Sequence, residues 1–278
     1  MVSRSAIAEN QTPEQVKDRP TVAKETAVQP KLKVSSLSIS YGTNCILKDI
    51  DLDVLPNEIF GIIGPANAGK TSFLKVINRM DTFNSNMSFT GDVEFNGLNT
   101  RNLRNYYALR SRIGVVFPLP VGLPLTIYEN VALAPRLKGI NNKAELDVIV
   151  ERCLVRSALW DEVKDRLDSL GSLLSGGQQQ RLTIARALSQ EPELLMLDEF
   201  SIAVDPVTTM RIEDVLKELK HEMTIILVTN LVQQARRLAD RTAFFLDGGC
   251  VEIGDTEAMF SGDVKDQKTI DYIEGRFG

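Results

Sequence analysis

The stretch that decides the fold of this chain is Gly64-Pro65-Ala66-Asn67-Ala68-Gly69-Lys70-Thr71. An apolar run, 59–63, precedes it, and an apolar-periodic segment through Phe73 and Ile77 follows it. A strand, a glycine-rich loop and a helix in this order turn backbone N–H groups and a helix N-terminus toward phosphate oxygens. In this pattern Lys70 reaches the β- and γ-phosphates of a nucleotide, and the hydroxyl of Thr71 binds Mg²⁺.

Composition places the chain among globular proteins with one substantial core or two modest ones. It has 278 residues, of which 43% are hydrophobic and 25% charged, and a net charge of -5. The acidic balance argues against a nucleic-acid partner, which would need a clustered basic surface. No apolar segment is long enough for a membrane span or resembles a signal peptide, so any membrane role requires a partner. We interpret Cys45, Cys153 and Cys250 as buried reduced thiols, because their spacing matches neither a disulfide framework nor a zinc site.

The chain divides into a short polar tail and one ordered domain. Residues 1–30 contain three prolines and few large apolar residues, which predicts a disordered tail. Ordered structure is expected over 31–278, beginning with strands up to Tyr41, from Ile46 to Val54 and around Val93 to Phe95. The tail is expected to carry no chemistry.

Helical and strand-like patterns alternate in the rest of the domain. A helical pattern over 144–170 predicts an inserted helical subdomain at about residues 120–190. Apolar runs then alternate with helical stretches, which predicts an α/β fold with a mostly parallel sheet covered on both faces. The strands are expected at 194–197, 224–228 and 243–246, and the helices at 179–188, 208–220 and 232–238.

An acidic pair closes the buried apolar run Leu194 to Leu197. Asp198 is placed to hold Mg²⁺, and Glu199 beside it can orient and deprotonate an attacking water. Taken alone, the pair is equally compatible with an ordinary acidic strand end.

A second phosphate-binding element lies in Ser175-Gly176-Gly177-Gln178, directly before the predicted helix 179–188. One nucleotide cannot easily use both elements within a single chain. Together with the first loop and the acidic pair, this segment resembles the ATP-binding subunits of ATP-binding-cassette transporters, over about residues 31–278. The resemblance implies a P-loop ATPase core with a β-rich N-terminal subdomain. It also implies two subunits paired head to tail, with each ATP held between one chain's phosphate loop and the other chain's Ser-Gly-Gly-Gln segment.

Further segments resemble the bacterial phosphate-importer branch of that family. They are Ile77 to Met80, Thr126 to Asn130, Ala158 to Val163, Ser175 to Arg181 and the ending Asp271 to Gly278. None of these residues is expected to touch the transported phosphate, so the cargo rests on the resemblance alone.

The resemblance assigns roles to individual residues. Tyr41 matches the aromatic residue that stacks on adenine, a contact worth about 1–3 kcal/mol by analogy with base stacking, although a core tyrosine is the alternative. Ser72 adjoins the triphosphate-binding residues 64–71, Asp198 matches the magnesium aspartate and Glu199 the catalytic base. Ser201 to Asp205 match the loop that signals between the two sites, although the wording around Asp205 is unusual for the family.

Two positions depart from the family. Pro118 stands where the family has a glutamine that contacts Mg²⁺ or the water, and Asn230 stands where it has a histidine that contacts the γ-phosphate. Proline offers no polar group there, and asparagine cannot become cationic. A lost hydrogen bond to a charged group costs about 1.5–3 kcal/mol, or roughly ten- to a hundredfold in rate. The sequence therefore predicts a weakened composite site, unless Glu199 alone sustains hydrolysis. His221 precedes the strand and cannot replace the missing histidine.

The resulting expectation is an ATPase that binds ATP and Mg²⁺ and drives phosphate import. Its expected partners are a second ATPase subunit, a paralog or a second copy, and membrane permease subunits, with a periplasmic phosphate-binding protein acting indirectly. It would lie peripherally on the cytoplasmic side of the inner membrane. The alternatives are a nucleotide-binding regulatory subunit that does not hydrolyse ATP, and a soluble cassette ATPase outside transport, which the lack of a second cassette and of a basic arm disfavours.

Overall fold

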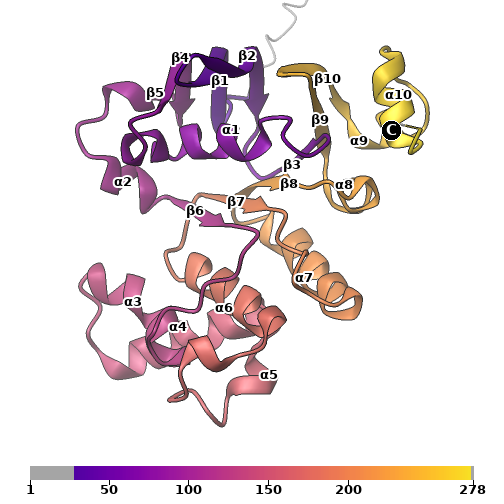
Figure 1. Cartoon of the computed structure of the whole chain (residues 1–278). Coiled ribbons are helices and arrows are strands. Elements are labelled where there is room, and N and C mark those ends of the chain that lie inside the picture. Colours follow the sequence, from indigo (N-terminus) through magenta and orange to yellow (C-terminus); the bar gives the residue numbers. More distant parts are fainter. Residues whose placement is uncertain (1–27, 277–278) are drawn as a thin grey trace, which may run out of the picture.

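The computed structural model describes residues 28–276, so most of the predicted tail lies outside the described residues (Figure 1).

An antiparallel sheet forms the N-terminal part of the structure. The strand order is β2-β1-β4-β5. Leu32, Val34, Leu37 and Ile39 of the first strand are buried on one face, which confirms the strand expected up to Tyr41. The strands are β1 (Leu32–Tyr41), β2 (Asn44–Val54), β4 (Met87–Phe95) and β5 (Leu98–Asn99).

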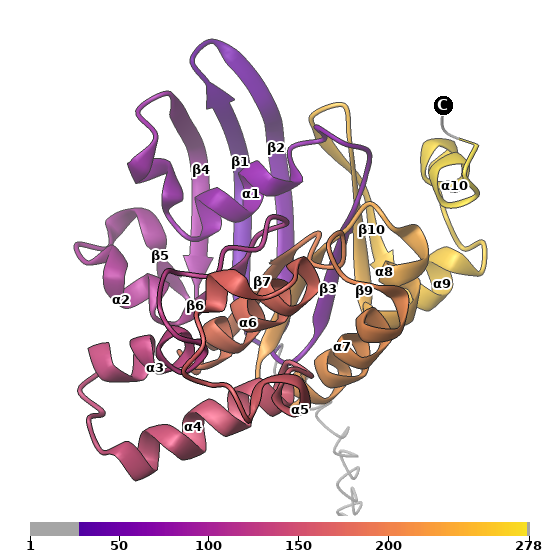
Figure 2. The same cartoon turned by 60° about the horizontal axis from the view of Figure 1, so that its bottom comes forward.

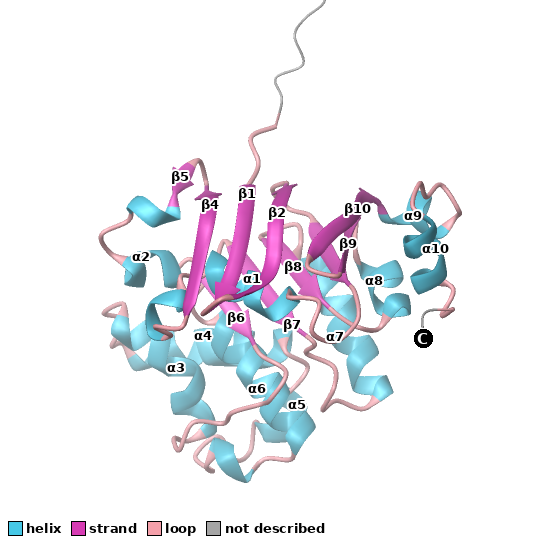
Figure 3. Cartoon of the chain, turned by 45° about the horizontal axis from the view of Figure 1, so that its top comes forward, coloured by secondary structure: helices cyan, strands magenta, loops and turns pink. Residues whose placement is uncertain are grey.

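A second, six-stranded sheet carries the phosphate-binding stretch. Its order is β10-β9-β3-β8-β7-β6, and all neighbours are parallel except β9 and β10. The expected mostly parallel sheet is therefore confirmed, and Figure 3 shows it beside the antiparallel sheet. The strands are β3 (Ile59–Ile63), β6 (Ile113–Val116), β7 (Leu194–Asp198), β8 (Thr224–Val228), β9 (Arg241–Leu246) and β10 (Gly249–Asp255).

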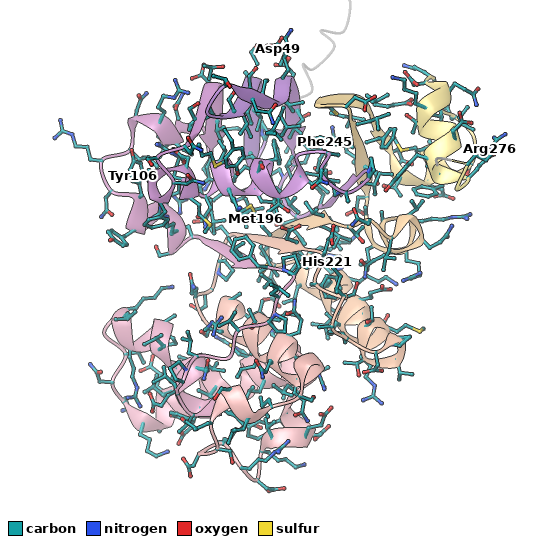
Figure 4. All side chains as sticks on the ribbon, viewed as in Figure 1. Asp49, Tyr106, Met196, His221, Phe245 and Arg276 are labelled. Atoms are coloured by element: carbon teal, nitrogen blue, oxygen red, sulfur yellow. The ribbon has the colours of Figure 1, made fainter. Side chains whose placement is uncertain are left out.

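Alternate residues of the central strands enter two different cores. Leu195 and Leu197 join a core with the helices α3 to α7. Met196 faces the other way, into a core shared with the antiparallel sheet and with α1 (Lys70–Ile77). In that second core the rings of Phe73 and Phe245 meet edge to face, 5.5 Å apart. Figure 4 labels Met196 and Phe245. Helix α1, and with it the phosphate loop, is thus clamped between two sheets.

The helices after β6 form a group of their own. Figures 1 and 2 show α3 to α6 lying together, with α7 alongside. Their grouping, on a core that they share with the large sheet, agrees with an inserted helical part, whose boundaries near residues 120 and 190 stay a prediction. Shorter helices complete the fold. The helices are α2 (Tyr106–Arg110), α3 (Ile127–Leu137), α4 (Lys143–Arg156), α5 (Trp160–Val163), α6 (Gly176–Leu188), α7 (Pro206–Leu219), α8 (Val232–Leu238), α9 (Thr256–Phe260) and α10 (Gln267–Ile273), with 3₁₀ turns at Met80–Phe83, Thr100–Asn102 and Gly171–Leu173.

The helical pattern expected over 144–170 contains α4 and α5, which are separated at Ala158, where the backbone is left-handed. Two expectations were wrong in detail. Helix α6 begins at Gly176, three residues earlier than predicted, because Ser175 caps it. Among the three cysteines, Cys153 is buried and Cys250 half-buried, but Cys45 is exposed near the start of strand β2.

No helix within residues 28–276 is both long enough and apolar enough to cross a membrane.

Candidate functional site

The phosphate loop needs its glycines for two close approaches. Gly64 has φ +151°, and a Cβ there would lie 2.1 Å from the carbonyl oxygen of Phe245. Gly69 has φ +89°, and a Cβ there would collide with Leu47. Gly69 also precedes α1 without any side-chain cap, and the first turn of that helix contains no acidic residue. The uncapped N–H groups and the helix dipole are therefore available to an anion.

The side chain of Lys70 lies inside this loop. Its ammonium donates to the carbonyl oxygens of Gly64 at 2.7 Å and Pro65 at 2.8 Å, and to Oδ1 of Asn230 at 2.7 Å. Lys70 is only 5% exposed, so the exposed lysine that a waiting phosphate site suggests was a wrong expectation. Burial lowers the pKa of Lys70, and the nearby Glu199 and Asp198 oppose that shift.

Thr71 and Asp198 meet across the end of strand β7. The hydroxyl of Thr71 donates to Oδ2 of Asp198 at 2.7 Å. The other oxygen, Oδ1, is buried without a hydrogen-bond partner. Burial raises the pKa of Asp198, and the hydrogen bond from Thr71 opposes the shift. A buried carboxylate oxygen without a partner, beside a threonine hydroxyl, fits the oxygen ligands that Mg²⁺ prefers.

Glu199 turns away from the strand direction at the residue after Asp198. Its φ is +48°, in the left-handed region, while its backbone N–H donates to the carbonyl oxygen of Val228 at 2.8 Å. Such a conformation is uncommon for a residue with a side chain and is kept only where the surroundings hold it. Glu199 lines the cavity beside the phosphate loop, whereas Asp198 is not among the residues that line it.

A cavity of about 380 Å³ gathers most of the residues singled out in the sequence. Glu199, Pro118 and Asn230 line it together with residues of the phosphate loop. The hydroxyl of Tyr41 lies 3.3 Å from Oγ of Ser72 at its rim. His221, before strand β8, is exposed and is not among the lining residues. The cavity is lined by Tyr41, Ile46, Ala66, Asn67, Ala68, Gly69, Lys70, Thr71, Ser72, Pro118, Glu199 and Asn230.

The Ser-Gly-Gly-Gln segment lies elsewhere, at the start of α6, and lines no part of this cavity. Ser175 and Gln178 form a reciprocal capping box, with each side chain bonded to the other's backbone N–H. Gly176 has nothing within 4 Å of the position that a Cβ would occupy. The structure therefore leaves an open, glycine-lined helix start on the surface of the chain.

Glu162 of α5 braces this helix start. Its carboxylate accepts from Arg181 at 2.6 and 3.1 Å and from Nε2 of Gln178 at 2.9 Å. These contacts, the one from Arg181 foremost, lower the pKa of Glu162.

The loop between β7 and α7 lies against the same helix start. A Cβ on Gly177 would lie 3.2 Å from the carbonyl oxygen of Ala203. Asp205 caps α7, accepting from the N–H of Thr208 at 2.9 Å. Hydrogen bonding from Thr208, first from its side chain and then from its backbone, lowers the pKa of Asp205. The predicted inter-site loop is thus exposed at Ile202 and anchored at Asp205.

Three polar residues near the site have no counterpart in the sequence analysis. Gln234 and Glu213 are buried and bonded to each other, and Arg237 forms two hydrogen bonds with the same glutamate. In the sequence they look like ordinary polar residues of two helices. Only the folded structure, in which Gln234 and Glu213 are buried, reveals them.

Comparison with known proteins decides the family. Residues 47–201 match the family described as ABC transporter. The chain is 47% identical over 251 residues to proteins named "Phosphate import ATP-binding protein PstB 1" from two strains of Streptococcus agalactiae, serotype III (NEM316) and serotype V (ATCC BAA-611 / 2603 V/R). The match covers 90% of this chain and 99% of each relative. This chain belongs to the ABC transporter family. The resemblance found in the sequence is thereby confirmed.

Solved structures of ABC proteins share the fold. A bacterial Atm1-family ABC exporter with ATP bound has a TM-score of 0.76 at 20% identity, covering 90% of this chain and 42% of that one. The ATP-binding cassette MJ0796, a dimer bound to ADP and Pi, has a TM-score of 0.72 at 28% identity, covering 81% and 98%. The protein cbiO1 of Clostridium perfringens has a TM-score of 0.72 at 25% identity, covering 84% and 92%. The ABC ATPase fold is therefore confirmed.

Proposed function

We propose that this ABC ATPase is the ATP-hydrolysing subunit of a bacterial importer of inorganic phosphate. The observation that carries the proposal is the cavity lined by Lys70, Thr71 and Glu199, next to which Asp198 accepts a hydrogen bond from Thr71 at 2.7 Å. The phosphate-import relatives support the cargo. We expect no cargo-binding role for this chain, because the residues that line its cavity suit a nucleotide.

The residues of the cavity divide the chemistry of ATP hydrolysis among them. Lys70 and the N–H groups of the loop would hold the β- and γ-phosphates, and Tyr41 would support the adenine. Thr71 and Asp198 would hold Mg²⁺, which neutralises charge developing on the phosphates. Glu199 would orient the attacking water and accept its proton. The partnerless Oδ1 of Asp198 supports the metal assignment.

The hydrolytic step in this cavity would be weakened by two residues. Pro118 presents no polar side chain to the cavity, and the amide of Asn230 is engaged with Lys70. We expect Pro118→Gln and Asn230→His together to raise steady-state ATP turnover more than either change alone, because both groups would act on the same phosphate and water. Unchanged turnover in the double variant would contradict a weakened site.

The Ser-Gly-Gly-Gln segment would complete the site of a second ATPase subunit. It lies at an open helix start outside the chain's own cavity, and it retains every residue of the family pattern. We expect Ser175→Arg to abolish transport by placing a cation in the partner's phosphate site. Glu199→Gln should be milder here than the matching change in a paralogous partner. Equal losses from the two glutamate changes in phosphate uptake and ATPase assays would favour a symmetric motor.

An apolar groove offers a surface for the membrane permease. The groove has a volume of about 550 Å³ and runs between the end of α1, α2 and α3. Its lining includes the exposed side chains of Phe83, Tyr107 and Leu137. Docking there would place the chain peripherally on the cytoplasmic face of the membrane, with the periplasmic phosphate-binding protein as an indirect partner. Leu137→Glu should remove the chain from permease-containing membranes, whereas Val148→Glu, at an exposed apolar residue outside the groove, should not.

A nucleotide-binding regulatory subunit is the second candidate, favoured by the unreactive Pro118 in the cavity. It predicts ATP binding without turnover, both alone and with the permease. A soluble ATPase outside transport predicts no co-purification with membranes.

A further inference from the structure

The ammonium of Lys70 has no free donor in this structure. A lysine ammonium has three N–H donors, and here they point to the oxygens of Gly64, Pro65 and Asn230. The first two acceptors belong to the phosphate loop itself. The third comes from a different segment, the loop that follows strand β8. Since an ammonium only donates, the amide of Asn230 must present its oxygen to Lys70.

The hydroxyl of Thr229 fixes the loop that carries Asn230, because it bonds to the residue that follows Asn230 and to helix α8. The N–H of Leu231 donates to Oγ1 of Thr229 at 3.0 Å, and this hydroxyl donates in turn to Oε1 of Gln234 at 2.9 Å. Thr229 and Gln234 are each 1% exposed. Asn230 therefore lies between Thr229 and Leu231, which are connected by the buried hydroxyl of Thr229.

The orientation of Gln234 is set by a buried charge. Its Nε2 donates to Oε1 of Glu213 at 3.1 Å, and Arg237 donates to both oxygens of that carboxylate at 2.7 and 2.8 Å. A carboxylate only accepts, so the amide must turn its NH₂ toward Glu213 and its oxygen toward Thr229. The same NH₂ lies 3.3 Å from Oγ of Ser201, the first residue of the inter-site loop.

We propose that Asn230 is a latch on Lys70, and that Gln234 and Glu213 are positioning residues that hold the latch loop in place. The inference rests on the nucleotide site of the proposed function. A nucleotide phosphate must displace the Asn230 oxygen from the ammonium before it takes that donor. The free chain is stabilised by a contact that the nucleotide-bound chain gives up, so the latch lowers nucleotide affinity.

The latch is tested with MgADP, which lacks a γ-phosphate and therefore excludes any direct contact of that group with residue 230. Isothermal titration calorimetry of the full chain should show binding about tenfold tighter for Asn230→Ala, because a hydrogen bond to a charged group is removed from the free state only. Asn230→Asp should bind at least tenfold more weakly, because its carboxylate pairs with Lys70 and repels phosphate. Unchanged or weaker binding by Asn230→Ala overturns the latch.

The positioning roles are tested by non-additivity. Gln234→Leu should also tighten MgADP binding severalfold, and it should add nothing in the Asn230→Ala background. Gln233→Leu, at the exposed neighbour on the same helix, is the matched control and should change nothing. Structural damage alone would weaken binding rather than tighten it. Equal gains in both backgrounds overturn the positioning role.

Glu213→Gln provides a second variant in case Gln234→Leu unfolds the chain, because it keeps the shape of the carboxylate but frees the orientation of the amide. It should tighten MgADP binding only when Asn230 is present. Failure of the unmodified chain to bind MgADP would instead remove the nucleotide site, and the proposed function with it. The two failures are therefore separable within one set of titrations.

Discussion

Two carbonyl oxygens of the phosphate loop accept hydrogen bonds from the ammonium of Lys70, a residue of the same loop. Lys70 is buried and its charge rests on backbone carbonyls, which differs from the solvated cation that the sequence suggests. Burial lowers its pKa, and a triphosphate would raise that pKa again by adding negative charge. Nucleotide binding thus exchanges neutral acceptors for charged ones.

Lys70→Ala should therefore weaken ATP binding at least a hundredfold while the chain stays folded. The variant loses charge-assisted contacts to phosphate, each worth about 1.5–3 kcal/mol. Calorimetric titration with ATP, paired with a thermal melt, measures both properties. Lys48→Ala, at an exposed strand position, serves as the control. ATP affinity that stays at the unmodified value would remove the loop from the site.

Asp198→Asn should raise the stability of the fold and remove the Mg²⁺ dependence of ATP binding. Burial raises the pKa of Asp198 above its unfolded value, so the stability that it contributes is present at low pH and lost as the pH rises through the folded pKa. At neutral pH without Mg²⁺, the neutral amide should add about 1 kcal/mol to the free energy of unfolding. ATP binding should at the same time lose its dependence on Mg²⁺. A variant that is less stable, or whose binding still requires Mg²⁺, contradicts this account.

At the scale of residues, the sequence predicts which side chains lie at the carboxyl ends of strands. The phosphate loop follows β3 and Asp198 ends β7, and the carboxyl ends of parallel strands in one sheet meet at a common edge. The burial of Lys70 and the pairing of Gln234 with Glu213 depend on segments far apart in sequence. No local pattern encodes them.

Helix α6 shows how a cap overrides composition. Two glycines disfavour a helix, and the predicted start at residue 179 lies after both of them. The capping box between Ser175 and Gln178 satisfies the first N–H groups and moves the start to Gly176. The brace from Glu162 to Arg181 then holds this helix start to α5.

Removing that brace should cost stability in the helical part. In Glu162→Ala, the side chain of Arg181, only 6% exposed, keeps two backbone acceptors but loses its carboxylate. We expect the free energy of unfolding to fall by about 1 kcal/mol, because hydrogen bonds to a charged group are lost but the 40% exposed Glu162 is screened by solvent. Asp161→Ala, whose side chain is 91% exposed, should change it little. Urea denaturation of both variants measures the difference, and equal losses would assign no role to the brace.

At the scale of the whole molecule, one carboxylate joins the two sheets. Glu193, just before β7, accepts from Arg112 at 2.5 Å, from Asn96 at the turn after β4 at 2.8 Å, and from Lys31 before β1 at 3.2 Å. These contacts, the one with Arg112 foremost, lower the pKa of Glu193 to about 2. The strand order that brings them together was not predictable, because it depends on pairings between distant segments.

Glu193 should make stability sensitive to acid. A carboxyl whose pKa is lower in the folded state contributes stability above its ordinary value of 4.5 and loses it as the pH falls toward about 2. Because the side chain is 39% exposed, solvent screening limits the contribution to about 1 kcal/mol. Thermal melts from pH 6 to pH 2.5 should decline less steeply for Glu193→Gln than for the unmodified chain or for Glu218→Gln. Parallel curves would assign the acid sensitivity to other carboxyls.

The chain contains a single tryptophan, Trp160, and it lies in the helical part, half-buried against the core that α3, α4 and α6 share with the large sheet. Intrinsic indole emission therefore comes from one known place. Excitation at the long-wavelength edge of protein absorbance selects tryptophan. The emission then reports on the helical part alone, because the phosphate loop and both sheets contain no tryptophan. A shift of the emission maximum on adding nucleotide would show, without any added label, that nucleotide binding at the phosphate loop changes the surroundings of Trp160 in the helical part.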